Sequence, residues 1–198
     1  MTNKRIVAYF IDFVIVSTLV SLIFSIYPLS PDINLYRNEM IRGMDALLVG
    51  DVSFDTFINR YAISYYNLME GLVHVNIATI AIVIFCYIAV PYSLDGQTIG
   101  KMITKIKISS RKNCLTPLNL FVRSFVINGL GYLILSVVFV FTSNGLSYFL
   151  LMSLIGLIQI IFILLGLFMM IFRSTNNTFH DKISYTCVLE RSDKNEKI

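Results

Sequence analysis

The chain has 198 residues, 56% of them hydrophobic, and a mean hydropathy of +0.74. Soluble domains are only about half apolar, so this composition indicates a membrane protein. The formal net charge is +4 and the pI about 9.0. In a soluble protein such a charge would suggest nucleic acid, but here the cations flank apolar segments. We therefore expect anionic lipid headgroups as the partner of these cations and no nucleic acid.

The apolar segments are each close to the roughly 20 residues that a helix needs to cross the hydrocarbon core. They cover residues 6–27, 73–94, 124–142 and 148–172. We predict an all-α integral membrane protein, a single domain over residues 1–198, with four transmembrane helices. Pro91 is expected to kink or end the second span, and Asn144-Gly145 to form a tight turn before the fourth. No internal repeat is apparent between the two pairs of spans.

The segment 95–123, between the second and third spans, is the most basic part of the chain. It contains one acid, Asp95, and the cations Lys101, Lys105, Lys107, Arg111, Lys112 and Arg123. The positive-inside rule puts this loop in the cytoplasm, together with both termini and the tail 173–198. Residues 100–103 resemble a short helical turn, and residues 103–110 alternate as a strand does. We expect a small cytoplasmic sheet between this strand and residues 182–191 of the tail.

The segment 28–72, between the first two spans, carries six acids and three arginines. This shortage of cations favours the external side of the membrane. Apolar residues at helical spacing predict an amphipathic helix over residues 54–72, with Ser53 as N-cap. A weaker helix is expected over residues 33–48, ended by Gly50. These helices either lie on the outer leaflet and cap the bundle or form a surface for a protein partner.

Asp12 lies inside the first span, where an ionised carboxylate costs about 2.5–3.5 kcal/mol. Arg123, at the inner end of the third span, is its expected partner. Asn128 lies at comparable depth, and Arg5 projects from the same face as Asp12, two helical turns earlier. An ion pair that holds the helices in register and a proton- or ion-binding role both remain open.

Motifs for catalysis or metal binding are not found in the sequence. His74 and His180 fall on opposite sides of the membrane in the predicted topology, and no Cys/His cluster has zinc-ligand spacing. The glycines of DGQTIGKM lack the spacing of a phosphate-binding loop. We therefore predict no enzyme, no catalytic residues, no metal and no cofactor.

Separated motifs in this sequence resemble those of the RDD family of small multi-pass membrane proteins. The matching residues are Arg5, Ala8 and Asp12 at the start, Gly96, Gln97, Thr98, Gly100 and Lys101 in the loop, Arg123, and finally His180, Asp181 and Thr186. Ser184 and Tyr185 depart from the small residues usual before the closing threonine, and the segment 28–72 is longer than the family minimum. The resemblance implies fold and topology. The family's molecular function is poorly defined, with cation/proton exchange suggested for some members.

These observations lead to two hypotheses on function. The first is a non-enzymatic bacterial inner-membrane protein, located in the cell (plasma) membrane, that acts as an accessory, scaffold or immunity-type partner through its external helices and its cytoplasmic basic loop. The second is a homo-oligomeric transporter of cations and protons, or of a small solute, that uses the carboxylate of Asp12. In both, Arg5, Asp12, Arg123, Asn128 and Asp181 form an intramembrane charge network.

Overall fold

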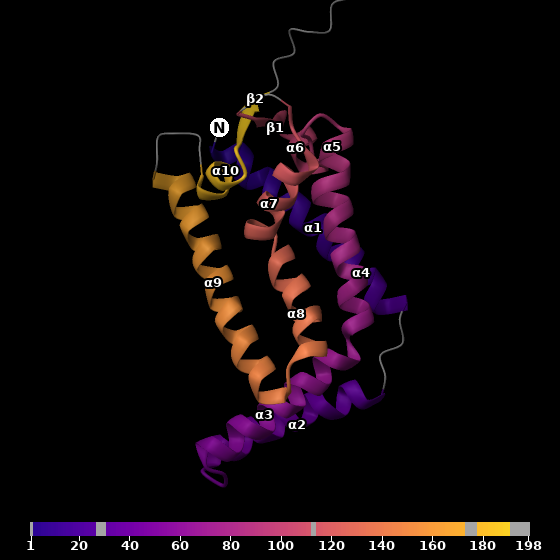
Figure 1. Cartoon of the computed structure of the whole chain (residues 1–198), viewed down its shortest axis with the longest axis vertical. Helices are drawn as coiled ribbons and strands as arrows, with labels where there is room; N and C mark the ends of the chain where they lie inside the picture. The colour runs from indigo at the N-terminus through magenta and orange to yellow at the C-terminus, as the bar shows by residue number, and fades with distance from the viewer. Residues whose placement is uncertain (1, 27–30, 112–113, 173–177, 191–198) are drawn as a thin grey trace, which may run out of the picture.

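The structure is a computed structural model that describes residues 2–26, 31–111, 114–172 and 178–190, and it is mostly helical (Figure 1). Within these residues, three helical segments are long and apolar enough to cross a membrane. They are α1 (Thr2–Ile26), the segment Val73–Ser93, and residues Gly145–Met169 of α9 (Gly145–Phe172). A bent pair of helices brings the number of spans to four if the pair is taken as one span.

The second span contains a π-helical turn beside Pro91. It is composed of α4 (Val73–Ile84), the π-helix η1 (Phe85–Ala89) and α5 (Val90–Ser93). Proline has no N–H and its ring clashes with the carbonyl four residues earlier, here that of Tyr87, which is in the π-helix. The helix ends at Ser93, two residues after Pro91, as predicted.

The predicted third span, 124–142, is wrong as one continuous helix. The chain forms α7 (Pro117–Ile127) and α8 (Leu130–Thr142), which meet at 78°. Thr116 and Asn119 form a capping box that starts α7 inside the predicted loop. Gly129 takes a φ of 72°, a left-handed conformation that breaks the helix. At about 1.5 Å per residue, the 13 residues of α8 are too short to cross about 30 Å of hydrocarbon alone.

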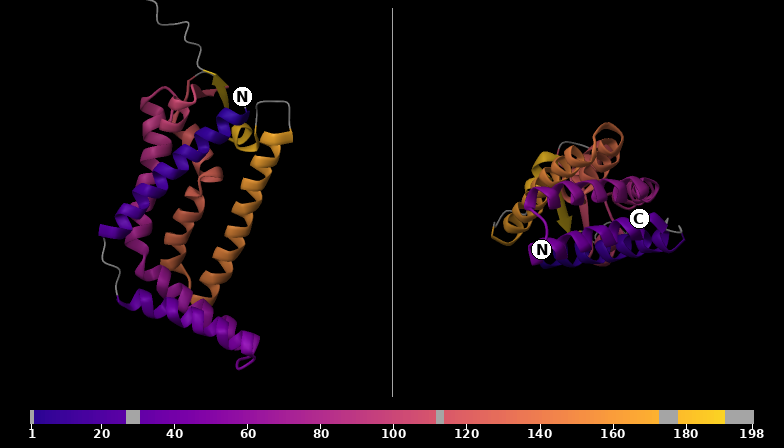
Figure 2. Two further views of the ribbon diagram at one scale, coloured as in Figure 1. Left: turned by 180° about the vertical axis from the view of Figure 1, so that it is seen from behind. Right: turned by 90° about the horizontal axis from the view of Figure 1, so that it is seen from below.

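The two helices predicted between the first spans are present as α2 (Pro31–Val49) and α3 (Phe54–Gly71). Ser53 caps α3 by accepting a hydrogen bond from the backbone N–H of Thr56, and Gly50 has a positive φ just after α2. Figure 2 shows that the two helices pack along each other across one end of the bundle. Which side of the membrane this end faces remains a prediction.

The predicted small sheet is confirmed. Strand β1 (Ile106–Ser110) pairs antiparallel with β2 (Thr186–Glu190), so that Ile108 lies opposite Val188. The sheet is anchored on α1 because Ile106 and Val188 pack against Ala8 in a buried cluster. The short helices α6 (Ile99–Ile103) and α10 (Phe179–Ile183) precede the two strands. All four elements lie at the end of the bundle opposite α2 and α3, beside the start of α1 (Figure 1).

Candidate functional site

The carboxylate of Asp12 is held by residues of the loop that contains α6. It accepts hydrogen bonds from the hydroxyl of Thr98 (2.5 Å) and the backbone N–H of Gly100 (2.8 Å). The ammonium of Lys101 lies 3.8 Å from the Oδ2 atom of Asp12. Asp12 is 5% exposed, so these groups replace the water that an ionised carboxylate needs.

The glycines of the loop are required by close backbone approach. Gly100 lies directly against α1, where a Cβ would overlap the carbonyl oxygen of Ala8. Gly96 has a φ of 84°, and a Cβ there would overlap the carbonyl oxygen of Ile108. Between them Gln97 is buried, with its amide nitrogen 3.5 Å from the carbonyl oxygen of Ile106. This part of the family motif therefore positions α6 so that the backbone N–H of Gly100 reaches Asp12.

Asp181 is the second buried carboxylate and is fully enclosed. It forms ion pairs with Arg5, at 3.3 Å, and with Arg123. It also accepts hydrogen bonds from the backbone N–H (3.1 Å) and the hydroxyl (2.7 Å) of Thr178, the N-cap of α10. Arg123 also donates to the hydroxyl of Thr186, and Arg5 to the carbonyl oxygen of Val188.

The predicted pairing of Arg123 with Asp12 is therefore wrong. The bend at Gly129 places Arg123 in the middle of α7, which packs against α10. Arg5 likewise pairs with Asp181. The amide of Asn128 donates to the hydroxyl of Ser124 and lines a cavity with Asp12. We use the term charge cluster below for Arg5, Asp12, Lys101, Arg123 and Asp181.

Burial and neighbouring charges fix the protonation of the groups around α6 and α10. Burial, reinforced by the charge of Arg123, lowers the pKa of His180 to about 3. The ring is neutral at pH 7, and its Nε2 accepts from the guanidinium of Arg123 at 3.3 Å, because a guanidinium has no acceptor. Burial alone would raise the pKa of Asp181, but Arg123 and the bonds from Thr178 hold it well below its usual range. Burial, followed by the charge of Arg123, lowers the pKa of Lys101 to about 8.

The loop that contains α6 and the one that contains α10 have the same structure, an internal repeat that the sequence analysis missed. Each begins with a threonine N-cap, forms a five-residue helix, passes through a residue of positive φ (Lys105 or Tyr185) and continues into a strand. Equivalent residues are separated by a constant offset of 80 positions, from Thr98 to Thr178. The paired residues Ile108 and Val188 are equivalent, so the two units are related by a local two-fold axis through the sheet.

The repeat carries opposite charges. Lys101 in the first unit corresponds to Asp181 in the second. Each pairs with an opposite charge on the long helix packed against it, Asp12 on α1 in the first case and Arg123 on α7 in the second. Arg5 is the additional cation, and it crosses from α1 to the second unit. The sequence signal for the repeat is short: the shared Thr-x-x-charge spacing, followed by Ile103 and Ile183 at equivalent positions.

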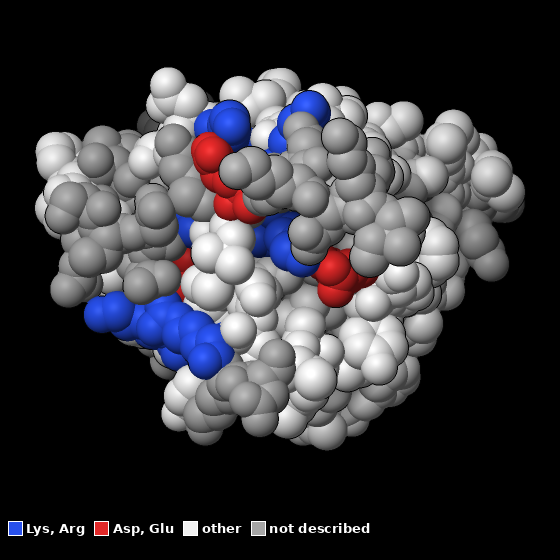
Figure 3. Space-filling view, turned by 90° about the horizontal axis from the view of Figure 1, so that it is seen from above, with Lys and Arg blue, Asp and Glu red and all other residues white. Residues whose placement is uncertain are grey.

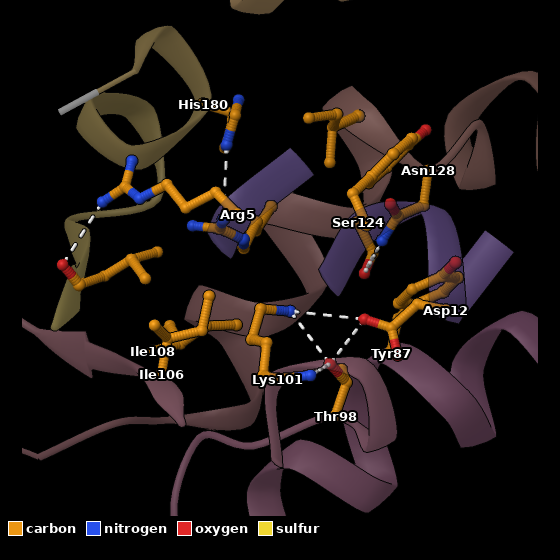
Figure 4. Close-up of a pocket in the computed structure, with 14 residues that line it drawn as sticks. Arg5, Asp12, Tyr87, Thr98, Lys101, Ile106, Ile108, Ser124, Asn128 and His180 are labelled. Atoms are coloured by element: carbon orange, nitrogen blue, oxygen red, sulfur yellow. Dashed lines mark hydrogen bonds and ion pairs between the residues drawn. The ribbon is translucent and has the colours of Figure 1, made fainter. Parts of the chain in front are cut away.

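A cavity of about 50 Å³ lies between the two units, and both line it (Figure 4). The first contributes Thr98 and Lys101, and the second His180 and Val188. Asp12 also lines a second, mostly apolar cavity of about 90 Å³ beside the π-helix. Figure 4 shows the ammonium of Lys101 directed at Thr98 and Asp12. No group of His, Cys, Asp and Glu in the described residues has the arrangement of a metal site.

The outer surface above the charge cluster carries exposed ion pairs. Lys4 pairs with Glu190 and Lys107 with Asp95, each at 3.0 Å. Figure 3 shows cations and acids side by side at this end of the molecule. Exposed pairs of this kind contribute at most about 1 kcal/mol to stability. The charges that position the helices are therefore those of the buried cluster.

Apolar spans joined at one end by a buried charge cluster define a multi-pass membrane protein. The sequence model of the RDD family matches residues 2–185, nearly the whole chain, and this protein belongs to that family. The closing Thr186 lies just past the matched region. No curated protein and no solved structure matches the chain.

Proposed function

We propose that this protein is a non-enzymatic accessory protein of the bacterial cell membrane that binds a protein partner through helix α2. The observation that carries the proposal is the exposed apolar stripe of α2, described below. In this proposal the charge cluster has a structural role, which is to hold α1, α7 and the two loops in fixed positions. Its carboxylates are already bonded to cations and donors from other elements, which is the arrangement of a structural ion-pair network.

The aromatic face of α3 is not available to a partner, because it packs on the bundle. The ring of Tyr61 lies 5.7 Å from that of Phe149, and the rings of Tyr65 and Tyr66 lie 5.9 and 5.6 Å from that of Tyr148. These contacts fix α3 across the ends of α8 and α9. A partner surface on this pair of helices must therefore be supplied by α2.

Helix α2 exposes Ile41, Met44 and Leu48, which are at helical spacing on one face and 50%, 52% and 83% exposed. Beside it, a groove of about 530 Å³ runs between α2 and α3. Charged residues of both signs line this groove: Glu39 and Arg42 from α2, and Arg60 from α3. An apolar stripe beside charges of both signs is consistent with a protein interface, which has an apolar centre and a polar rim.

Photo-crosslinking in native membranes tests this proposal. A photoreactive residue at position 44 is expected to give a covalent adduct with one protein of defined mass. The matched control is position 150, where Leu150 is 57% exposed on the apolar helix α9 and should give only lipid adducts. Met44→Lys should prevent the adduct formed from a photoreactive residue at position 41. Lipid adducts alone at both positions would overturn the proposal.

The second candidate function is proton-coupled cation transport, and it is supported by the position of Asp12 between two cavities and opposite a π-helix. Such π-turns are frequent at functional sites. The test is sodium- or potassium-linked proton flux in proteoliposomes containing the wild type, Asp12→Asn or the control Glu39→Gln. Flux that is lost only in Asp12→Asn would establish transport and contradict a purely structural role for Asp12.

A further inference from the structure

The groove between α2 and α3 is lined by charged side chains that are available to a ligand. Arg42 from α2 and Arg60 from α3 reach it, and in the described part of the chain neither guanidinium pairs with a carboxylate. Glu39 accepts a hydrogen bond from the hydroxyl of Ser64 at 3.0 Å through one carboxylate oxygen, which leaves the other oxygen as an acceptor. The other charged residues of this helix pair are exposed and, among the described residues, do not line the groove: Asp32, Arg37, Asp45, Asp51, Asp55 and Glu70.

The packing of α2 on α3 brings the two arginines to one level of the groove. Glu39 bonds to Ser64, and a Cβ added to Gly43 would lie 3.7 Å from the ring of Phe57. On each helix the arginine lies between these two contact positions. Guanidinium groups match the oxygens of a phosphate and donate to them in pairs. A phosphate group therefore fits the groove at this level.

A second groove starts at Tyr61 and follows the membrane span α9. It has a volume of about 450 Å³ and is lined by residues of α3, α8 and α9. Tyr61 lines both grooves, and its ring lies 5.5 Å from that of Phe57 in the first and 5.7 Å from that of Phe149 in the second. From Phe149 to Ile160 the second groove covers about 16 Å of α9, at about 1.5 Å per residue. This is about half of the roughly 30 Å hydrocarbon core, the depth that one acyl chain fills.

Tyrosines mark this end of the bundle as the level of the lipid headgroups. They lie where α3 packs on the first turns of α9: Tyr61, Tyr65, Tyr66 and Tyr148. Tyrosine is enriched at the membrane–water interface, where its ring lies among the headgroups. The apolar span of α9 begins at the same place, at Gly145, and Figure 1 shows this end of α9 beside α3. The first groove therefore lies at the level of the phosphates, and the second extends from it into the hydrocarbon.

We propose that the two grooves together bind one phospholipid whose headgroup carries a phosphate and a primary ammonium, as in phosphatidylethanolamine. Its phosphate binds Arg42 and Arg60, its ammonium binds Glu39, and one acyl chain lies along α9. A purely anionic headgroup would leave Glu39 facing negative charge, and a choline headgroup has no N–H to donate to it. Both grooves are within the range of about 300–1,000 Å³ that is typical of small-ligand sites.

The lipid site is distinct from the partner surface proposed above. Among the described residues that line the two grooves, Ile41, Met44 and Leu48 are not included, so a bound lipid leaves the stripe of α2 exposed. Binding of the lipid therefore does not depend on the protein partner, and each can fail its test separately.

Native mass spectrometry of the protein purified in detergent tests the site. Phosphatidylethanolamine, phosphatidylcholine and phosphatidylglycerol with the same oleoyl chains are added separately, and their adducts are titrated. One molecule of phosphatidylethanolamine should bind with a Kd about tenfold or more below that of the other two, because a hydrogen bond between charged groups has about this effect. Glycerophosphoethanolamine, which has the headgroup without the chains, should not displace it at equal concentration. Equal Kd values for the three lipids, or displacement by the free headgroup, would overturn the proposal.

Substitutions in the first groove test the headgroup contacts. Glu39→Gln keeps an acceptor for Ser64 but loses the charge that binds the ammonium, so the preference over phosphatidylglycerol should disappear. Arg60→Gln should weaken the binding of all three lipids about tenfold. The control is Arg37→Gln, which removes an exposed cation of α2 outside the groove and should change no Kd. A retained preference in Glu39→Gln, or the same loss in Arg37→Gln as in Arg60→Gln, would contradict the assignment.

Substitutions at Gly156 test the groove for the acyl chain. A Cβ at Gly156 would lie 3.7 Å from the ring of Tyr132, an ordinary contact, so Gly156→Ala should leave lipid binding unchanged. Gly156→Leu fills the groove and should weaken the binding of all three lipids, with the preference for phosphatidylethanolamine retained. Circular dichroism checks that each variant is folded. Binding equal to the wild type in Gly156→Leu, or a bound protein in place of the lipid when the chain is extracted from its membrane, would refute the lipid as the occupant.

Discussion

The two repeat units have one backbone structure and opposite charges, and their surroundings make them unequal. In the first unit, Lys101 and Asp12 form a single pair at 3.8 Å, supported by Thr98 and a backbone N–H. In the second, one carboxylate, Asp181, holds two arginines from two helices. The comparison shows that a repeated loop geometry can position either sign of charge. The number of ion-pair partners then decides how much the stability of the protein depends on each carboxylate.

Loss of the carboxylate in the second unit should have the largest effect. Asp181→Asn removes the buried carboxylate that pairs with both Arg5 and Arg123, and we expect a loss of about 3–5 kcal/mol in unfolding free energy. Asp12→Asn keeps one acceptor oxygen and leaves only Lys101 unpaired, so a loss of about 1–3 kcal/mol is expected. Denaturant unfolding in detergent measures both.

A double-mutant cycle is the control for the difference between Asp181→Asn and Asp12→Asn. Arg123→Ala combined with Asp181→Asn should show a coupling energy of about 1–3 kcal/mol, whereas Arg123→Ala combined with Asp12→Asn should be nearly additive. Equal losses for the two single carboxylate variants would contradict the inequality of the units.

The pH dependence of the unfolding free energy should report on the second unit, because His180 belongs to it. His180 has a pKa of about 3 in the folded protein, below the usual 6.5, so the unfolded state binds more protons between these values. Stability should therefore fall as the pH drops below 6.5, with a slope of up to about 1.4 kcal/mol per pH unit. Unfolding midpoints measured between about pH 4.5 and 6.5 test this. His180→Gln should flatten the slope, and an unchanged slope in that variant would refute the assignment.

An effect of about the same size as that of Asp12→Asn should come from the tight contact between the first unit and α1. In Gly100→Ala, the new methyl group would meet the carbonyl of Ala8 and the carboxylate of Asp12, at a cost of about 1–3 kcal/mol. The matched control is Gly156→Ala in α9, where the nearest atom, on the ring of Tyr132, is 3.7 Å away. That change should be neutral or slightly stabilising, because alanine favours a helix. Thermal unfolding compares the two, and equal stability would contradict the close approach of α6 to α1.

The local patterns in the sequence were sufficient for most of the elements. Hydropathy predicted the first, second and fourth spans, and helical spacing with a serine cap predicted α3. Alternation of apolar and polar residues predicted the two strands, and the structure confirms their pairing. Each of these signals comes from one continuous run of residues, about 20 for a span and fewer for a cap or a strand, so a single sequence contains them.

Only the tertiary structure decided which charges pair. Hydropathy treats residues 124–142 as one span, but the chain bends by 78° at Gly129. As a result, Arg123 pairs with Asp181 and not with the predicted partner, Asp12. The equivalence of Lys101 and Asp181 was equally hidden, because a capping threonine and a positive-φ residue preserve the loop while the side chains around them differ in size and charge. The sequence alone therefore determined that buried charges must be compensated, because an isolated charge in hydrocarbon is costly. Which partner compensates each charge depends on contacts between residues that are 58 to 176 positions apart, and folding alone brings these together.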